Sequence, residues 1–348
     1  MPDSPTRHFC TYFDRQYLSR GLALRGSLAR HCPAFRLWAL CMDDVSYDVL
    51  SRMRLPGLEP IALEELEAYD RPLAAVKPHR ERLEYYFTCT PSLPGFLFER
   101  QPEIDLLTYL DADLFFFDSP EPIFDELRPA SIGIIEHRFP PHLRDWGRYG
   151  IYNVGWVSFR RDAAGQECLR WWRERCIEWC YDRCEDGRFA DQKYLDDWPD
   201  RFRNVVSLRH GGANVAPWNV LQYCVESVKG RAHIDGTPLI FYHFHGFRRR
   251  SRWVYDTSLS HYGAGAGRAL RGRVYRPYAR AVATAAAEVE RRAGIRLVET
   301  GPRFLETMPQ FQAPLSRYLQ PLTDRCTPAV AVLQALWRGQ YVFAPYGR

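Results

Sequence analysis

Residues 106–117 read LLTYLDADLFFF, and the predicted fold class follows from this pattern. An apolar run of strand length, Leu106–Leu110, leads into Asp111 and Asp113, and a second apolar run, Leu114–Phe117, closes the segment. A continuous apolar strand is typical of a sheet that is covered on both faces. Two carboxylates placed two residues apart on an extended chain point to the same side. We therefore predict a buried strand that delivers two acidic side chains to one place.

The acidic pair predicts a metal site. Burying two like charges together is costly unless a cation compensates them. A hard divalent cation with oxygen ligands provides this charge, and a bound diphosphate can complete its coordination. Mn²⁺ is the favoured ion and Mg²⁺ the second candidate. The alternative is an acidic turn between strands with both carboxylates solvated, but the apolar flanks favour the metal.

The segments before and after this stretch predict an α/β fold. Strands are expected over residues 8–13, 35–42, 132–135, 154–159 and 239–243, and helices over 17–31, 81–98 and 168–184. Apolar strands that alternate with helices are typical of a layered structure around a covered sheet. Pro91 and Pro94 are expected to interrupt the helix over 81–98. Cys176, Cys180 and Cys184 would share one helix face, more consistent with buried thiols than with a structural zinc site.

The C-terminal region differs from the rest in charge and pattern. Residues 247–348 contain 17 arginines against 6 acidic residues, which suggests an anionic partner such as nucleic acid, an anionic lipid or a phosphorylated glycan. The alternative is an arginine-rich face that is only solvated. The strand pattern ends near residue 260, and Ala279–Arg292 is an Ala-rich helix former. We expect a domain over 1–260 and a basic, mainly helical extension over 261–348. Peripheral contact with the inner membrane, through Trp337, Tyr341, Phe343 and Tyr346, is weighed against simple packing of this region on the first domain.

Composition excludes several classes of protein. With 14% aromatic and 46% hydrophobic residues in 348, the chain is not disordered. No apolar stretch reaches the length of a membrane span, and the N-terminus lacks the apolar core of a secretory signal. The ten cysteines are scattered and show no C-x-x-C pair. Because no secretory signal is found, reduced thiols and a cytoplasmic location are expected. A nucleic-acid binder that rests on the basic C-terminal region is the least favoured reading, so nucleic acid is not an expected partner. GAGAG at 263–267 makes a poor phosphate loop, because no strand leads into it and no Lys-Ser/Thr follows.

A second polar cluster, FYHFHGFRRRSR at 241–252, could complete the metal site. A predicted strand delivers His243 and His245 on one side, followed by Gly246 and a basic run that includes Arg249. Imidazole joined to carboxylates favours Mn²⁺ over Mg²⁺. Arginines bind phosphate oxygens through a planar fork. By itself a histidine pair at a strand end is more often structural.

Two further segments carry polar side chains at the junctions of elements. Asn153 and Gly155 lie in YNVG, and Asp191 and Gln192 lie in FADQ. Such side chains could bind a polyhydroxyl ligand. Asp191 could equally be the N-cap of the helix that follows it, and the residues taken without further context favour the cap.

In their order along the chain, these pieces resemble the retaining glycosyltransferases of family 8. The resemblance rests on FCTYFDRQYLSRGLALRGSL, YLDAD, YNVGWVSF, ADQKYL and HFHGFRR, and it spans roughly residues 7–255. The acidic motif is weak by itself, and the ordered set of five is fairly specific. The family includes glycogenin and bacterial lipopolysaccharide galactosyl- and glucosyltransferases. It implies a GT-A fold, which is a Rossmann-like mixed sheet flanked by helices, and a nucleotide-sugar donor.

The resemblance also implies roles for individual residues, each by its place in a motif. It implies metal ligation by Asp111, Asp113 and His243, donor binding by Thr11, Tyr12, Asp111, Asn153, Gly155, Gly246 and Arg249, and Asp191 and Gln192 beside the anomeric carbon of the donor sugar. The segment HGGANVAPWN at 210–219 adds Asn214, Trp218 and Asn219 as candidate sugar or acceptor contacts.

The chain departs from the family pattern at three points. Arg249 stands where lysine is expected, and the Pro-Trp pair that usually follows is absent, with Trp253 as a shifted candidate. The basic residue expected before the acidic motif has no clear match, and Lys77 or Arg82 could replace it. These departures keep His245 open as an alternative metal ligand.

The resulting hypothesis is a metal-dependent, retaining glycosyltransferase. It would move a hexose from a nucleoside diphosphate sugar, with UDP-sugars favoured, to a glycan or lipid-linked acceptor, as in cell-surface polysaccharide or lipopolysaccharide synthesis. One alternative is a non-catalytic nucleotide-sugar or glycan-binding protein on the same scaffold. The other is a phosphatase with Asp111 as its nucleophile, although Leu114 stands where such enzymes usually have Thr or Val.

Overall fold

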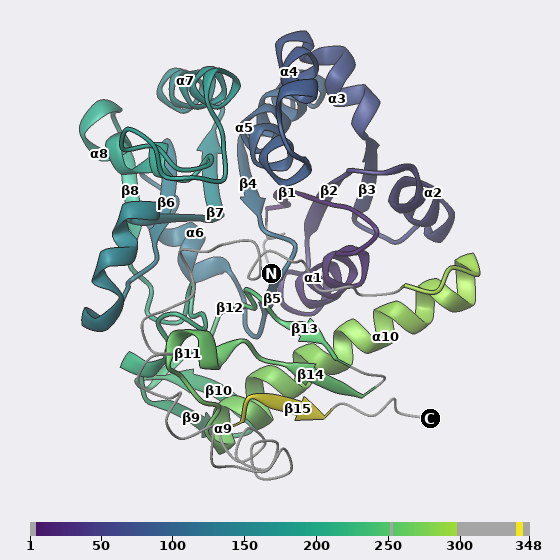
Figure 1. Cartoon of the computed structure of the whole chain (residues 1–348), viewed down its shortest axis with the longest axis vertical. Helices are drawn as coiled ribbons and strands as arrows, with labels where there is room; N and C mark the ends of the chain where they lie inside the picture. Colours follow the sequence, from purple (N-terminus) through teal and green to yellow (C-terminus); the bar gives the residue numbers. More distant parts are fainter. Residues whose placement is uncertain (1–4, 251–252, 298–338, 344–348) are drawn as a thin grey trace.

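The computed structural model of the chain describes residues 5–250, 253–297 and 339–343, and a seven-stranded mixed sheet lies at its centre (Figure 1). Of the seven strands, β7 is antiparallel to both of its neighbours, and every other adjacent pair is parallel. In spatial order the strands are β3 (Leu58–Ala62), β2 (Phe35–Cys41), β1 (Arg7–Phe13), β4 (Leu106–Leu110), β7 (Tyr152–Arg160), β6 (Ile132–Glu136) and β8 (Val205–Leu208).

Helices cover both faces of this sheet and bury two separate apolar cores against it. Successive side chains of a strand point to opposite faces, so Phe9 of β1 enters one core and Cys10 the other. The helices are α1 (Leu18–His31), α2 (Asp44–Met53), α3 (Leu63–Tyr69), α4 (Arg71–Val76), α5 (Arg82–Arg100), α6 (Glu121–Leu127), α7 (Ala163–Glu178), α8 (Trp198–Arg201), α9 (Arg268–Leu270) and α10 (Arg276–Ala293), with shorter helical turns η1 (Lys77–His79), η2 (Pro141–Tyr149), η3 (Lys193–Asp197), η4 (Val220–Gln222), η5 (Leu259–Tyr262) and η6 (Arg271–Tyr275). The expected α/β class, a Rossmann-like mixed sheet flanked by helices, is confirmed.

Two local predictions about helices are wrong. The helix α5 continues through Pro91 and Pro94, because residues 88–94 are all buried and packing replaces the hydrogen bonds that the prolines remove. The helix α7 ends at Glu178, where the backbone of Trp179 becomes extended. Cys180 and Cys184 therefore lie beyond the helix, and Cys184 is exposed. The three cysteines do not share a helix face.

Three small sheets lie at one end of the central sheet. The strands β5 (Leu114–Phe116) and β12 (Phe241–His243) form an antiparallel pair. The strands β9 (Val225–Val228), β10 (Arg231–Ile234) and β11 (Thr237–Pro238) form a second antiparallel sheet. A third joins β13 (Arg248–Arg249), β14 (Val254–Asp256) and β15 (Tyr341–Phe343). The first of these sheets positions the candidate site.

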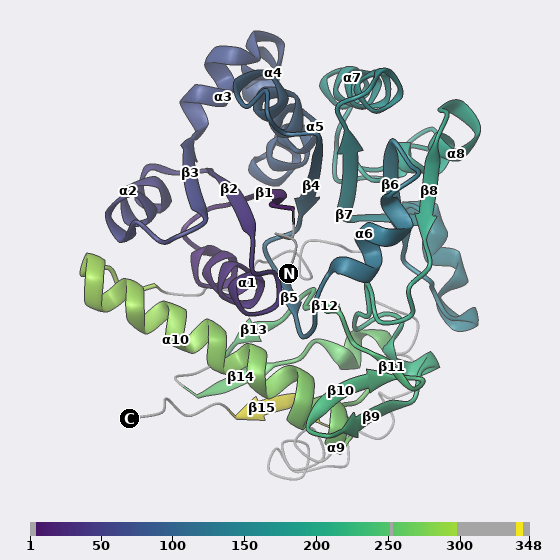
Figure 2. The ribbon, with the colours of Figure 1, turned by 180° about the vertical axis from the view of Figure 1, so that it is seen from behind.

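The described part of the basic C-terminal region packs into the molecule. Seen from behind, α10 runs from α9 past α1 towards α2 (Figure 2). Its Ala286 and Val289 join the core of α1, and Tyr278 and Val282 join a third core together with Tyr242. The strand β15 pairs with β14. These contacts agree with the packing alternative for the region; Trp337 and Tyr346 lie outside the described residues.

Within the ranges that the structure describes, none of the helices has both the length and the apolar character needed to cross a bilayer.

Candidate active site

Pairing between β5 and β12 brings the acidic motif to the histidine cluster. His243 pairs with Leu114, and the N–H of Phe244 donates to the carbonyl oxygen of Asp113 at 3.0 Å. The two side chains consequently meet, with Nε2 of His243 at 3.1 Å from Oδ1 of Asp113. Both are almost fully buried. The acidic motif and the His-x-His segment, far apart in the sequence, therefore form one site.

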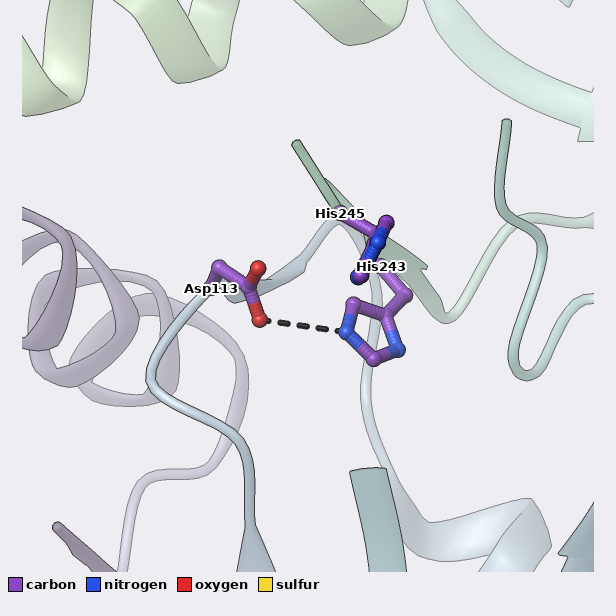
Figure 3. Close-up of side chains that lie close together, drawn as sticks. All are labelled: Asp113, His243 and His245. Atoms are coloured by element: carbon purple, nitrogen blue, oxygen red, sulfur yellow. Dashed lines mark ion pairs between the residues drawn. The ribbon is translucent and has the colours of Figure 1, made fainter. Parts of the chain in front are cut away.

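His245 joins this pair. Its ligand atom and those of Asp113 and His243 all lie within 4.8 Å of one another, an arrangement that could hold a metal ion. Figure 3 shows Asp113 facing the two imidazole rings, with the ion pair to His243 drawn. The chain turns after β12 ends at His243, so the two histidines do not lie on one continuous strand as expected. They nevertheless reach the same point.

Asp111 lies beside the group formed by Asp113, His243 and His245 but is not part of it. Its Oδ2 is 3.6 Å from Nε2 of His243, while its Oδ1 accepts a hydrogen bond from the hydroxyl of Tyr109 at 2.8 Å. The N–H of Leu114 donates to the carbonyl oxygen of Asp111, so the motif is a turn and the expected extended chain is wrong. The solvated alternative is also wrong for Asp113, which is 7% exposed.

The charges in the site are strongly coupled. Burial, with the Asp113 carboxylate also contributing, raises the pKa of Asp111 to about 6, although His243 acts to lower it. Burial also acts to raise the pKa of Asp113, but the nearby His243 outweighs it and brings that pKa down to about 2. Burial acts to lower the pKa of His243, and the Asp113 and Asp111 carboxylates reverse this, so the net pKa is raised. Burial and the charge of His243 lower the pKa of His245 to about 4.

The donor set fits a divalent transition metal. Asp113 supplies a carboxylate oxygen, and His243 and His245 supply imidazole nitrogens. A mixed set of nitrogen and oxygen donors suits Mn²⁺ better than Mg²⁺, which prefers oxygen. The low pKa of His245 leaves its ring neutral near pH 7, the form in which imidazole binds metals.

A cavity of about 170 Å³ opens beside these residues. Aromatic rings form much of its wall: Tyr12, Phe87, Phe139, Trp146, Tyr149, Phe189, Trp218 and Tyr262. The polar side chains on the wall are Asp111, His137, Asn153, Asp191, Gln192, His243 and His245. The cavity therefore joins aromatic surfaces to the candidate metal ligands.

Asp191 and Gln192 reach the cavity from the segment before η3. Asp191 is 4% exposed, and burial, with the nearby Asp111 carboxylate also contributing, raises its pKa to about 7. The N-cap alternative for Asp191 is wrong, because Gln192 stands at the N-cap of η3 and makes no capping bond. Nε2 of Gln192 instead donates to the carbonyl oxygen of Tyr149 at 2.9 Å.

Asn153 and Gly155 contact His243 from β7. Oδ1 of Asn153 lies 3.1 Å from Nδ1 of His243. A Cβ atom on Gly155 would lie 2.6 Å from Oδ1 of Asn153 and 2.9 Å from Nδ1 of His243. Only glycine leaves room for that hydrogen bond. The N–H of Asp111 donates to the carbonyl oxygen of Gly155, which fixes the strand beside the acidic motif.

The other residues predicted to bind the donor lie at different distances from the cavity. Tyr12 is on its wall. Thr11 and Asn214 are completely buried, and the amide of Asn214 donates to the carbonyl oxygen of Glu136. Gly246 has a φ of 70° in the turn after His245, and Arg249 lies in β13. The structure does not place Thr11, Asn214, Gly246 or Arg249 on the cavity wall.

Other candidates raised by the sequence have identifiable partners. Arg82 forms an ion pair with Asp14 at the end of β1 and donates to the hydroxyl of Tyr86, while Lys77 pairs with Glu67. Of these two candidates, Arg82 is the one that contacts the end of the strand that carries Tyr12. Trp218 packs edge-on against the rings of His243 and His245. The side-chain amide of Asn219 donates to two backbone carbonyl oxygens. Trp253 is half exposed.

His137 and most of the aromatic wall were missed by sequence reasoning. His137 directly follows β6, which runs in the same direction as β4, so its side chain lies at the same sheet edge as Asp111. Polar residues at the carboxyl ends of such strands commonly line ligand sites. That signal was present in the sequence. The aromatic residues of η2 gave no comparable signal.

Comparisons with known proteins identify two relatives in Bacillus subtilis (strain 168). "Uncharacterized protein YfnD" is 34% identical over 245 residues, which is 70% of this chain and 78% of YfnD. "Uncharacterized protein YfnF" is 35% identical over 251 residues, which is 70% of this chain and 82% of YfnF. No family model matches the chain.

Among solved structures, the likenesses are distant. Mouse xyloside xylosyltransferase 1 has a TM-score of 0.46 at 15% identity, covering 69% of this chain and 98% of that one. The galactosyltransferase LgtC, solved with donor and acceptor sugar analogs, has a TM-score of 0.47 at 15% identity, covering 71% of this chain and 89% of that one. Both neighbours are named as glycosyltransferases, and at this similarity their activities are not carried over to this chain.

Proposed function

The chain belongs to the family of the Bacillus subtilis proteins YfnD and YfnF, and we propose that it is a metal-dependent, retaining glycosyltransferase that uses a nucleoside diphosphate sugar. The observation that carries the proposal is the group of Asp113, His243 and His245 on the edge of an aromatic cavity. The group supplies a cation site for a diphosphate, and the cavity supplies a place for a sugar. The five ordered motifs of the sequence lead to the same function.

The size of the cavity supports one sugar ring as its occupant. At about 170 Å³ it is smaller than the roughly 300–1,000 Å³ of pockets that enclose drug-sized ligands. A complete nucleotide sugar would therefore extend out of it, with the diphosphate at Asp113 and the nucleotide towards β1. Aromatic rings such as Trp146 and Tyr149 offer flat apolar surfaces for the C–H faces of a hexose.

The polar residues divide the chemical work. A cation held by Asp113, His243 and His245 would neutralise the charge that develops on the departing diphosphate. Asp191 and Gln192 lie on the cavity wall, where they would face the anomeric carbon of the sugar. Retention requires attack from the face that the diphosphate leaves, or a covalent intermediate. Replacing Asp191 by Ala should lower turnover by about 100-fold, the lower range for losing one preorganised polar group.

The acceptor is a hydroxyl of a glycan or of a lipid-linked sugar, and UDP-sugars are the favoured donors. Arginine-rich residues 261–348 would attract an anionic acceptor or an anionic lipid surface in the cytoplasm, the latter as a peripheral contact. Surface attraction of this kind is screened by salt. Sedimentation with anionic vesicles at low salt tests the membrane contact separately from the transfer reaction.

A thermal-shift screen tests the proposed function. UDP-, GDP-, CMP- and dTDP-sugars are added to the full-length chain with Mn²⁺ or with EDTA, because a ligand that binds the native state raises its apparent stability. One class of donor should raise the melting temperature only when Mn²⁺ is present. Donor binding without cleavage would instead indicate a non-catalytic binding protein. Release of phosphate from a phosphate monoester, unaffected by nucleotide sugars, would indicate the phosphatase.

A further inference from the structure

A chain of hydrogen bonds leads from a backbone carbonyl to the metal-binding face of His243. It starts at the carbonyl oxygen of Ile151, which lies 3.2 Å from Nδ1 of His137. A carbonyl oxygen can only accept, so the proton of the neutral His137 ring is on Nδ1 and its Nε2 carries a lone pair. Burial lowers the pKa of His137 to about 3, which keeps this ring neutral.

The lone pair of His137 fixes the direction of the Asn153 amide. Nδ2 of Asn153 lies 3.3 Å from Nε2 of His137 and 3.4 Å from Oε1 of Gln192. Gln192 is itself oriented by a backbone carbonyl, because its Nε2 donates to Tyr149 at 2.9 Å. Two acceptors therefore face the amide nitrogen of Asn153. Its oxygen must point the other way, towards His243.

The oxygen of Asn153 in turn holds a proton on Nδ1 of His243. It lies 3.1 Å from Nδ1 of His243 and can only accept, so Nδ1 is the donor. Nε2 of the same ring faces Asp113 at 3.1 Å. The Asp113 carboxylate also only accepts, so Nε2 carries a proton until a cation takes its place, and Nε2 is the nitrogen that a cation would bind. A reversed Asn153 amide would place its NH₂ group against Nδ1 and favour a proton on Nε2, which blocks ligation there.

We propose that His137 is a positioning residue that acts through Asn153 to keep a proton on Nδ1 of His243 and so leave its Nε2 as the nitrogen directed at a divalent cation. The ring of His137 is suited to this role because it is rigidly held. It stacks on Phe139 at 4.6 Å, and Trp218 and Asn219 both donate to its backbone carbonyl oxygen. The proposal rests on the metal site of the proposed function and is independent of the transfer reaction.

The first test observes the proton directly, without metal. The full-length chain is labelled with ¹⁵N-histidine and studied by NMR in EDTA, and His243→Gln identifies the His243 signals. The wild type should show a protected Nδ1–H on His243. In His137→Phe, which cannot accept from Asn153, that signal should exchange with water at least about tenfold faster. His233→Gln, in the distant strand β10, is the matched control and should leave the signal unchanged.

The second test separates positioning from a merely structural role. Loss of a group that orients a metal ligand typically weakens metal affinity by about 10–100-fold, so His137→Phe should weaken Mn²⁺ binding by at least about tenfold. In Asn153→Asp, both side-chain oxygens accept, so the His243 proton no longer depends on His137. In that background, adding His137→Phe should change the Mn²⁺ dissociation constant by less than about threefold.

The outcomes separate this proposal from the proposed function. An equal loss of Mn²⁺ affinity from His137→Phe in both backgrounds would overturn the positioning role, and so would a wild-type His243 without an Nδ1–H. Unchanged Mn²⁺ binding in His137→Phe would overturn it as well. A protected Nδ1–H that depends on His137, in a protein that binds no nucleotide sugar, would support the positioning and refute the transferase.

Discussion

At the scale of single residues, the site depends on how closely a few side chains approach one another. Asn153 and His243 can form their hydrogen bond only because Gly155 has no Cβ atom between them. The sequence predicted that Asp111, Asp113, His243, Asn153, Asp191 and Gln192 belong to one site, and the structure brings these six together. The sequence could not predict which oxygen faces which nitrogen in the site, because those contacts are set by strand register.

Gly155→Ala tests this close approach. The new methyl group would overlap Oδ1 of Asn153 and Nδ1 of His243, so one of the two side chains must move. Mn²⁺ affinity, measured by calorimetry, should fall by at least about tenfold, and overpacking should cost about 1–3 kcal/mol of stability. Gly26→Ala is the control, because its methyl group meets no atom within 4 Å. Equal Mn²⁺ affinity in both variants would contradict the geometry.

Asp113→Asn tests the metal assignment. A neutral amide cannot compensate the cation, so Mn²⁺-dependent donor binding should be abolished while the protein stays folded, as judged by circular dichroism. Asp125→Asn, at an exposed carboxylate on α6, should bind donor like the wild type. Turnover in Asp113→Asn at the wild-type rate would remove Asp113 from the metal site.

Asp191→Asn tests the buried carboxyl through pH. The native pKa of about 7 lies above the ordinary 3.8, so the folded chain holds a proton that the unfolded chain has lost between these values. Wild-type stability should therefore fall as pH rises from about 4 to 7, and the variant should lack this fall. Measured in EDTA, the free energy of unfolding of Asp191→Asn should exceed that of the wild type by up to about 4 kcal/mol at pH 8, and by less than half of that at pH 5. Urea unfolding at both pH values measures this difference in stability. An equal difference at pH 5 and pH 8 would contradict the raised pKa of the Asp191 carboxyl.

At the scale of elements, the sequence predicted single strands better than the contacts between elements. The apolar runs at β1, β2, β4 and β7 were correctly expected as strands, because apolar pattern is a local property. The pairing of β5 with β12, which creates the site, joins residues more than a hundred positions apart and has no local signal. The continuation of α5 through two prolines likewise depends on burial against its neighbours.

Tyr278→Ala tests how α10 supports the segment that carries the histidines. Tyr278 is fully buried and stacks on Phe244, which lies between His243 and His245, with ring centroids 3.7 Å apart. Removing a large aromatic side chain from a core typically costs about 3–5 kcal/mol, so urea unfolding should show a loss of this size together with weaker Mn²⁺ binding. Tyr69→Ala, at an exposed tyrosine of α3, should change both by little. Full Mn²⁺ affinity in a destabilised Tyr278→Ala would show that α10 does not hold the site.

At the scale of the whole molecule, the C-terminal region is joined to the sheet domain by its apolar contacts. The helix α10 buries Val282 and Val289, and β15 pairs with β14. The domain boundary near residue 260 remains a prediction. Four arginines of the basic region, Arg276, Arg280, Arg291 and Arg292, lie on α10, a helix whose other face is core.

Truncation at residue 260 tests this connection. A chain of residues 1–260 lacks α10 and should be largely insoluble and inactive in donor hydrolysis, because the cores beneath that helix become exposed. A chain of residues 1–297 keeps α10 and should remain more soluble. A soluble 1–260 chain that hydrolyses donor would contradict this account and establish an independent domain.

Cleavage of the donor followed by NMR tests the central claim most directly. The full-length chain is incubated with the nucleotide sugar that the thermal screen selects, and the diphosphate and the anomeric proton of the released or transferred sugar are followed over time. The account predicts that nucleoside diphosphate appears only with Mn²⁺, that the first sugar product keeps the anomeric configuration of the donor, and that Asp113→Asn forms neither. Cleavage at an equal rate in EDTA, inversion of the sugar, or no cleavage of any donor with saturating Mn²⁺ would contradict it.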